Sequence, residues 1–114
     1  MEELVAKKIF VLILFLPSSN DLHQDHSTVS KEGIRSFKTT TILGYEIPWN
    51  NISFQAESFI ILSEENINTK INALDVYNSQ KSKNYANEEF IRSLERARGV
   101  QIGGKYAEAF EVIK

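Results

Sequence analysis

The sequence contains no cysteine, which excludes a disulfide framework, a thiolate metal site and a thiol nucleophile. Basic charge is not in excess either, because the formal net charge is −2, and the composition therefore predicts no nucleic-acid partner. The longest apolar run, residues 9–16, is far shorter than the roughly 20 residues that a membrane span needs. We expect a cytoplasmic protein that binds neither nucleic acid nor a membrane.

The apolar run, Ile-Phe-Val-Leu-Ile-Leu-Phe-Leu, has two interpretations. Lys7 and Lys8 stand before it, as in a short secretory signal, but Glu2 and Glu3 offset their charge and no small-x-small cleavage site follows. A continuous apolar run of this length is typical of a parallel strand that is buried on both faces. The strand is the favoured interpretation.

The rest of the chain alternates between strand-like and helix-like patterns. In its first half we expect a helix with Val29, Gly33, Ile34 and Phe37 at helical spacing, followed by strands at 39–47 and 52–62, the latter broken near 56–58. In its second half we expect a helix capped by Ser63, a loop at 78–85 and a helix from Asn87. A turn at 103–104 and a strand at 106–113 should follow. The apolar faces of the two later helices should comprise Ile67, Ile71, Leu74 and Tyr77 in one and Phe90, Ile91, Leu94 and Ala97 in the other, which should end at Gly99.

This order of elements is typical of an α/β protein. A parallel strand as apolar as 9–16 must be covered on both faces and paired on at least one edge. Only one short helix follows it before the pattern turns to further strands. We therefore expect part of a larger sheet.

The two histidines of the chain, His23 and His26, stand directly after the apolar run, with Asp25 between them. Polar loops after buried strands are where open α/β sheets usually place their chemistry. Imidazole is a common metal ligand, and a nearby carboxylate can orient it. The motif alone is short, and it also fits a solvated loop in which Asp25 or Ser27 caps the following helix.

The surrounding sequence resembles the second half of the PIG-L/LmbE family of zinc-dependent deacetylases, which remove acetyl from N-acetylglucosamine-type amino sugars. The segment Asn20–Val29 resembles the second metal motif of that family. Further segments agree in the same order: Tyr45–Asn50, Lys70–Leu74 with Tyr77, Ser79-Gln80, Arg98–Gln101 and Tyr106–Phe110.

The resemblance implies a Rossmann-like three-layer α/β/α fold and specific roles for three residues. His26 would be a zinc ligand, His23 would polarise the acetyl carbonyl, and Asp25 would hydrogen-bond an imidazole. In the family, a metal-bound water that an aspartate deprotonates attacks the amide carbon, and acetate leaves the amino sugar.

The sequence departs from the family in one large respect. The first family motif, a His-Pro-Asp-Asp segment, supplies two zinc ligands and the base, and this sequence contains neither His-Pro nor Asp-Asp. We therefore expect residues 1–114 to be one partial domain that lacks the amino-terminal half, binds zinc weakly and is inactive alone. The alternatives are one half of a split deacetylase completed by another polypeptide, a self-associating chain, or a non-catalytic remnant that binds sugars or other partners.

Other polar residues have a structural interpretation beside a functional one. Arg92, Arg96 and Arg98 could grip a phosphate, but an i,i+4 pair with Glu88 and the helix carboxyl end explain them better. Trp49 could stack on a sugar ring or simply pack. Glu108 lies in a segment that resembles the family, and no role follows for it from the sequence.

Overall fold

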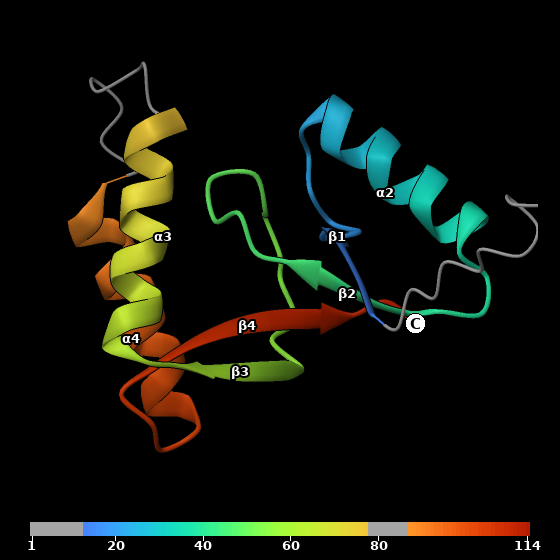
Figure 1. The fold of residues 1–114 in the computed structure, drawn as a ribbon. Coiled ribbons are helices and arrows are strands. Elements are labelled where there is room, and N and C mark those ends of the chain that lie inside the picture. Colours follow the sequence, from blue (N-terminus) through green and yellow to red (C-terminus); the bar gives the residue numbers. More distant parts are fainter. Residues whose placement is uncertain (1–12, 78–86) are drawn as a thin grey trace, which may run out of the picture. The chain divides into compact units, whose positions relative to one another are not determined.

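The computed structural model describes residues 13–77 and 87–114 (Figure 1). These residues form three helices and four strands: β1 (Ile13–Pro17), α2 (Gln24–Ser36), β2 (Thr41–Tyr45), β3 (Ser58–Leu62), α3 (Glu64–Tyr77), α4 (Glu88–Gln101) and β4 (Tyr106–Val112). Hydrogen bonds order the strands β1-β2-β4-β3 in a mixed sheet. The expected α/β class is confirmed, whereas the three-layer Rossmann-like arrangement stays a prediction.

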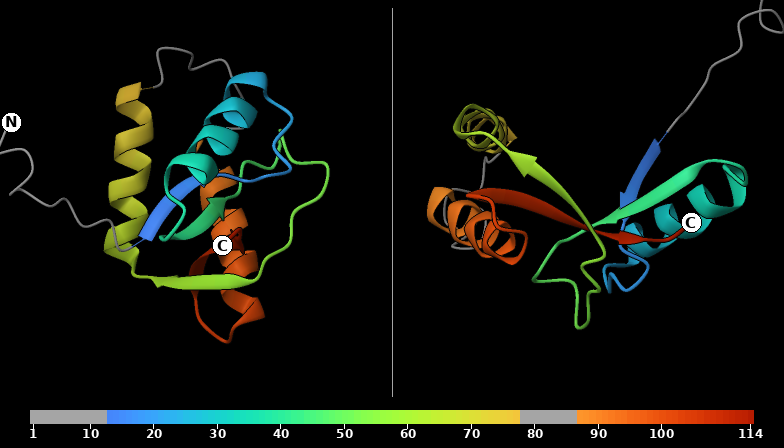
Figure 2. Two further views of the ribbon diagram at one scale, coloured as in Figure 1. Left: turned by 90° about the vertical axis from the view of Figure 1, so that its right-hand side faces the viewer. Right: turned by 90° about the horizontal axis from the view of Figure 1, so that it is seen from below.

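The described chain divides into two compact units. The first comprises residues 13–54 and 111–114. In it, β1 and β2 run parallel, with Ile13 opposite Thr41 and Pro17 opposite Tyr45. The helix α2 packs against β1 (Figure 2). Gly33 lies close to β1 in this packing, and a Cβ there would lie 2.5 Å from a methyl group of Leu16, which would have to shift.

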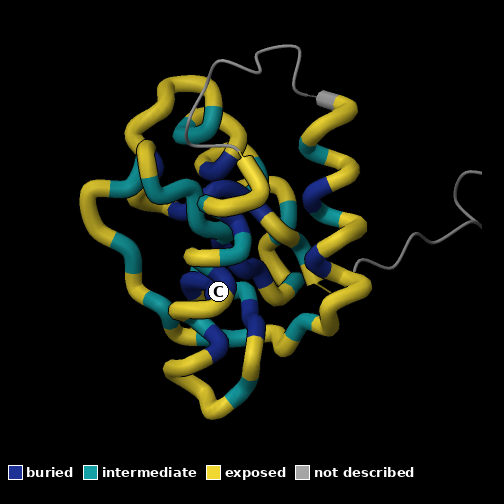
Figure 3. The backbone as a smooth tube through the Cα atoms, turned by 90° about the vertical axis from the view of Figure 1, so that its left-hand side faces the viewer, coloured by how far each residue is buried: buried dark blue, intermediate teal, exposed yellow. Residues whose placement is uncertain are grey.

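The second unit comprises residues 55–77 and 87–110. In it, β3 and the first five residues of β4 pair antiparallel, and α3 packs against both α4 and β3. Ile67 and Ile71 of α3, Ile91 of α4 and Tyr106 of β4 form the buried core, with Leu62, Leu74 and Phe90 partly buried against it. Figure 3 shows how buried and exposed positions alternate along the helices. The apolar spacing thus predicted the core positions Ile67, Ile71, Leu74, Phe90 and Ile91 correctly. Leu94 is only partly buried, and the side chain of Tyr77 lies outside what the structure describes.

Local signals set the helix starts of the second unit. Ser63 accepts the backbone N–H of Asn66, and Asn66 accepts that of Ser63, at 3.1 and 3.0 Å. This reciprocal cap satisfies two N–H groups that a helix start leaves unpaired. Asn87 caps α4 in the same way through the N–H of Phe90 at 2.8 Å. Both expected helix starts are confirmed.

Several sequence-based expectations are wrong. His23, rather than Asp25 or Ser27, caps α2, because α2 begins at Gln24 and the His23 ring accepts the backbone N–H of Asp25. The helix α4 continues past Gly99 to Gln101, because Gly99 serves a close contact rather than a stop: a Cβ there would lie 2.4 Å from the carbonyl oxygen of Lys105. Ala97 is exposed, and so is Val29, 51% of whose surface is accessible.

The expected strand segments are shorter in the structure. Of 52–62 only β3 is a strand, and the residues before it form no strand. The turn at Gly103-Gly104 is confirmed, and Gly103 has a positive φ of 74° that favours glycine. Residues 9–12 of the first strand and the loop expected at 78–85 lie outside the described residues.

The strand β1 is less covered than its apolar sequence predicts. Leu16 is buried, but Ile13 and Phe15 keep 49% and 46% of their surface exposed. Among the described residues β1 pairs only with β2. The expectation that this strand is buried on both faces therefore fails at Ile13 and Phe15, which alternate along β1 and share one face. In the part of the chain that the structure describes, no helix combines the length and the apolar character that crossing a membrane requires.

Candidate functional site

The histidine segment lies at the carboxyl ends of the two parallel strands of the first unit. Pro17 at the end of β1 is opposite Tyr45 at the end of β2, and the chain enters the two loops that follow. The loop after β1 leads through Asp21 to His23 and into α2. The carboxyl edge of neighbouring parallel strands is the usual place for a binding site in an α/β sheet.

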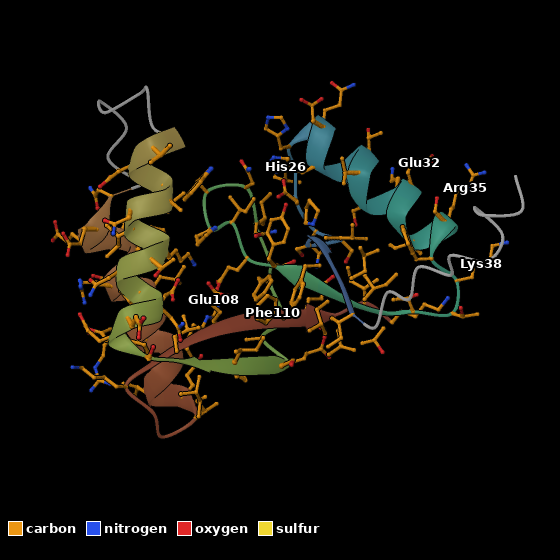
Figure 4. The ribbon with its side chains drawn as sticks, viewed as in Figure 1. His26, Glu32, Arg35, Lys38, Glu108 and Phe110 are labelled. Carbon is orange, nitrogen blue, oxygen red and sulfur yellow. The ribbon has the colours of Figure 1, made fainter. Side chains whose placement is uncertain are left out.

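The imidazole of His26 is oriented by a buried carboxylate. Its Nδ1 lies 3.0 Å from Oδ2 of Asp21, and the Asp21 side chain has no exposed surface, whereas that of His26 keeps 32% (Figure 4). A carboxylate accepts but cannot donate, so the proton of the neutral ring belongs on Nδ1. Nε2 of His26 then carries a lone pair that can bind a metal ion.

His23 has the opposite arrangement. Its Nδ1 accepts the backbone N–H of Asp25 at 3.2 Å and thereby caps α2. Because Nδ1 is an acceptor, the proton of the neutral ring belongs on Nε2, which can donate a hydrogen bond. The two rings stack with centroids 4.3 Å apart and an interplanar angle of 23°. The site thus presents one acceptor nitrogen and one donor nitrogen side by side.

The loop after β2 supports the same segment. The backbone N–H of Leu22 donates to the carbonyl of Asn50 at 2.9 Å, and the amide nitrogen of the Asn50 side chain lies 3.5 Å from Nδ1 of His26. Asn51 holds this loop by accepting the N–H of Ile47 at 2.8 Å. Burial, and then the negative charge of Asp21, raises the pKa of the Tyr45 hydroxyl at the end of β2.

The structure assigns the orienting carboxylate to Asp21, which the sequence reasoning missed, rather than to Asp25. Among the described residues, the side chain of Asp25 makes no hydrogen bond to either imidazole, and only its backbone N–H contacts His23. Asp21 also accepts the N–H of His23 at 2.8 Å. An aspartate whose side chain accepts the N–H two residues on is a familiar turn signal, so Asp21 was recognisable as structured but not as the partner of His26.

The donor set for a metal is incomplete within the described residues. No group of three or more histidine, cysteine or carboxylate side chains in 13–77 and 87–114 is placed to hold a metal ion. His26 offers one ligand atom, whereas catalytic zinc usually takes three protein ligands. The described residues therefore do not form a zinc site by themselves.

The remaining candidates from the sequence fall in structural roles or stay unassigned. Glu108, on β4 (Figure 4), accepts the Lys70 ammonium at 2.7 Å, and the same ammonium binds Glu95. Arg92 forms the expected pair with Glu88 at 3.0 Å and a second with Glu64 at 2.7 Å. Trp49 is 49% exposed, which leaves both interpretations of it open.

The other two arginines bind groups near the end of α4. Arg96 donates to the carbonyls of Gly104 and Lys105, and Arg98 donates to the side chain of Gln101. Both contacts support the structural interpretation of these arginines.

No protein-family model matches the sequence, and no curated protein matches it significantly.

Proposed function

We propose that the histidine segment is part of a hydrolase site for the deacetylation of N-acetylglucosamine-type amino sugars, in a Rossmann-like domain of the PIG-L/LmbE type. His26 provides one zinc ligand through Nε2. His23 donates from Nε2 to the acetyl carbonyl oxygen, where negative charge develops as the amide is attacked. Asp21 holds His26 in the tautomer that a ligand needs.

One observation carries this proposal, namely the opposite environments of the two Nδ1 atoms. Nδ1 of His26 faces the Asp21 carboxylate at 3.0 Å, with the Asn50 amide nitrogen more distant at 3.5 Å, and Nδ1 of His23 faces a backbone N–H. A pair of solvated histidines without a role needs no such division between an acceptor ring and a donor ring. The division matches the roles that the family resemblance implies, and it follows from hydrogen bonding alone.

The rest of the site must come from elsewhere, because this sequence has no His-Pro-Asp-Asp segment and the described residues hold no three-ligand group. When bound, zinc would supply a water of lowered pKa and a charge near the amide carbonyl. We propose that these residues act only when ligands and a base from outside residues 1–114 complete the site. Alone, they bind zinc weakly and hydrolyse nothing.

Co-expression with a polypeptide that carries an opening strand and a His-Pro-Asp-Asp segment tests this function. We expect a complex that holds zinc and deacetylates N-acetylglucosamine substrates. In it, His26→Ala should remove the metal. His23→Asn should keep the metal and the cap of α2, because asparagine is a favoured N-cap, and should lower kcat by about 10²-fold through loss of the imidazole donor.

Gln24→Ala is the matched control, since Gln24 is exposed at the start of α2 and should change neither metal content nor kcat. A zinc-loaded, active complex that is indifferent to both histidine substitutions would show that the assigned roles are wrong. A chain that holds one tight zinc and turns over substrate without a partner would refute the need for completion.

A non-catalytic protein is the second candidate, and the incomplete donor set of the described residues favours it. In that case the segment binds an amino sugar, or another partner, through the imidazoles without hydrolysing it. Failure of any complex to form, together with saturable binding of N-acetylglucosamine that His23→Asn weakens, would favour this function over the split enzyme.

A further inference from the structure

Glu111, near the end of the chain, is buried against the loop that follows β1. Only 6% of its surface is exposed. Its carboxylate accepts hydrogen bonds from the Ser18 hydroxyl at 2.8 Å, the Ser19 N–H at 3.1 Å, the Ser19 hydroxyl and the Asn20 side-chain amide at 3.4 Å. One side chain therefore binds three consecutive residues that lie more than 90 positions earlier in the sequence.

The carboxylate of Glu111 is stabilised by hydrogen bonds from neutral donors. No ion pair joins it to a lysine or arginine among the described residues. A buried carboxylate is tolerated only if its oxygens are hydrogen-bonded, and hydrogen bonds to a charged acceptor are stronger than those between neutral groups. The donors of Ser18–Asn20 are thus fixed in place as a group, and a neutral replacement for Glu111 would hold them less well.

The loop that Glu111 fixes leads directly to the histidine site. The carbonyl of Ser18 accepts the N–H of Asp21 at 3.0 Å, and Asp21 in turn orients His26. Gly44 on β2 makes room for this arrangement, since a Cβ there would lie 3.0 Å from Cα of Ser18 and 3.5 Å from Cβ of Glu111. A continuous chain of contacts joins Glu111 to the imidazole of His26.

We propose that Glu111 is a positioning residue for the histidine pair, acting through the Ser18–Asn20 loop to place the carboxylate of Asp21 against Nδ1 of His26. The catalytic importance of this positioning rests on the proposed function. The tautomer of His26, however, can be measured on the full chain without substrate or partner. A negative result here is therefore distinct from a failure of the deacetylase proposal.

The test compares Glu111→Gln with the unmodified full chain by imidazole ¹H–¹⁵N correlation spectra at about pH 8, where ordinary imidazoles are neutral. Unmodified, His26 should show the Nδ1–H tautomer and His23 the Nε2–H tautomer. Glutamine keeps the shape but replaces one acceptor oxygen with a donor. We expect a large shift of His26 toward a mixture of tautomers, while helix content stays unchanged.

Glu32→Gln is the matched control, because Glu32 is exposed on α2 and, among the described residues, forms an ion pair with Arg35 alone; it should leave the spectrum unchanged. Ser18→Ala is a second variant that removes the hydroxyl bound to Glu111 and should shift His26 in the same direction. Retention of the original tautomer in folded Glu111→Gln would overturn the proposal. Loss of folding in both variants would also overturn it, because Glu111 would then support the unit as a whole.

Discussion

The two units bury carboxylates in different ways. In the second unit, Glu95 is 1% exposed and binds the ammonium of Lys70, which also binds Glu108. In the first unit, Asp21 and Glu111 are buried as well, but their partners are hydroxyl, amide and imidazole groups. One unit satisfies its buried charge with an opposite charge, and the other satisfies it with neutral donors.

The two kinds of network have different roles: the one in the second unit stabilises the fold, and the one in the first unit shapes the candidate site. The second-unit network joins α3, α4 and β4, so its energy depends on keeping three elements together. The first-unit network fixes one short loop and leaves Nε2 of both histidines without a partner among the described residues. A binding site requires side chains whose orientation is fixed by supporting contacts of this kind.

Apolar burial follows the same division. The core of the second unit contains Ile67, Ile71 and Ile91 at 8% exposure or less. Among the described residues of the first unit, the buried apolar side chains are those of Leu16, Ile42 and Leu43, whereas Ile13 and Phe15 of β1 remain about half exposed. Lost burial of side chains of this size amounts to about 1 kcal/mol or more each. We infer that the second unit holds the larger reserve of stability, and three predictions test this inference.

Replacing Lys70 should have the largest effect. Lys70→Met removes the ammonium that binds the buried carboxylate of Glu95. Breaking a fully buried pair from one side costs about 3 kcal/mol or more, and because the Lys70 side chain keeps 37% of its surface exposed, solvent screening reduces the expected loss to about 2 to 3 kcal/mol. Chemical denaturation should show this loss in the free energy of unfolding. Lys31→Met on the exposed face of α2 is the control and should change stability by less than about 0.5 kcal/mol. Equal effects of the two substitutions would refute the structural role of the network.

Two glycines set the packing of the two units and should differ in sensitivity. The Cβ of Gly99→Ala would lie 2.4 Å from a backbone oxygen, and that of Gly44→Ala 3.0 Å from a backbone carbon. We expect losses in unfolding free energy of about 2 and 1 kcal/mol respectively, within the range for overpacking. Gly104→Ala, which has only distant neighbours at 3.9 Å, should be nearly neutral. Thermal melts of the three variants would reveal a reversed order.

The smallest effect concerns pH. Burial lowers the pKa of Lys70, but the hydrogen bonds that its ammonium donates to Glu108 and Glu95, together with the charges of these carboxylates, outweigh burial and raise the pKa above the ordinary 10.5. The stabilisation is thus fully present below about pH 10.5 and is lost as the pH rises through the higher folded-state value. The stability gap between the unmodified chain and Lys70→Met should therefore narrow in strongly alkaline solution.

The pKa of Tyr45 is also raised, but Tyr45 is present in both the unmodified chain and Lys70→Met. Its contribution therefore cancels when the unfolding free energies of the two are subtracted. Denaturation at a series of pH values from neutral to strongly alkaline would measure the gap. A gap that widens with pH would contradict the direction assigned to Lys70.

The sequence by itself determined those features that depend on neighbours along the chain. The caps at Ser63 and Asn87 and the apolar faces of α3 and α4 follow from contacts within a few residues, so spacing alone revealed them. The place of His23 and His26 after an apolar strand was equally visible. Their division into an acceptor ring and a donor ring was not, because it depends on which atoms the fold brings to each Nδ1.

Only the tertiary structure decided which carboxylates serve which groups. Asp21 rather than Asp25 orients His26, because the helix start directs the two aspartates differently. Glu111 reaches Ser18 across 93 positions, and Lys70 reaches Glu95 and Glu108 across 25 and 38. Such pairs produce no regular spacing in the sequence. A buried charge interacts with whichever polar groups the fold brings next to it, and the interaction matters because water is excluded there.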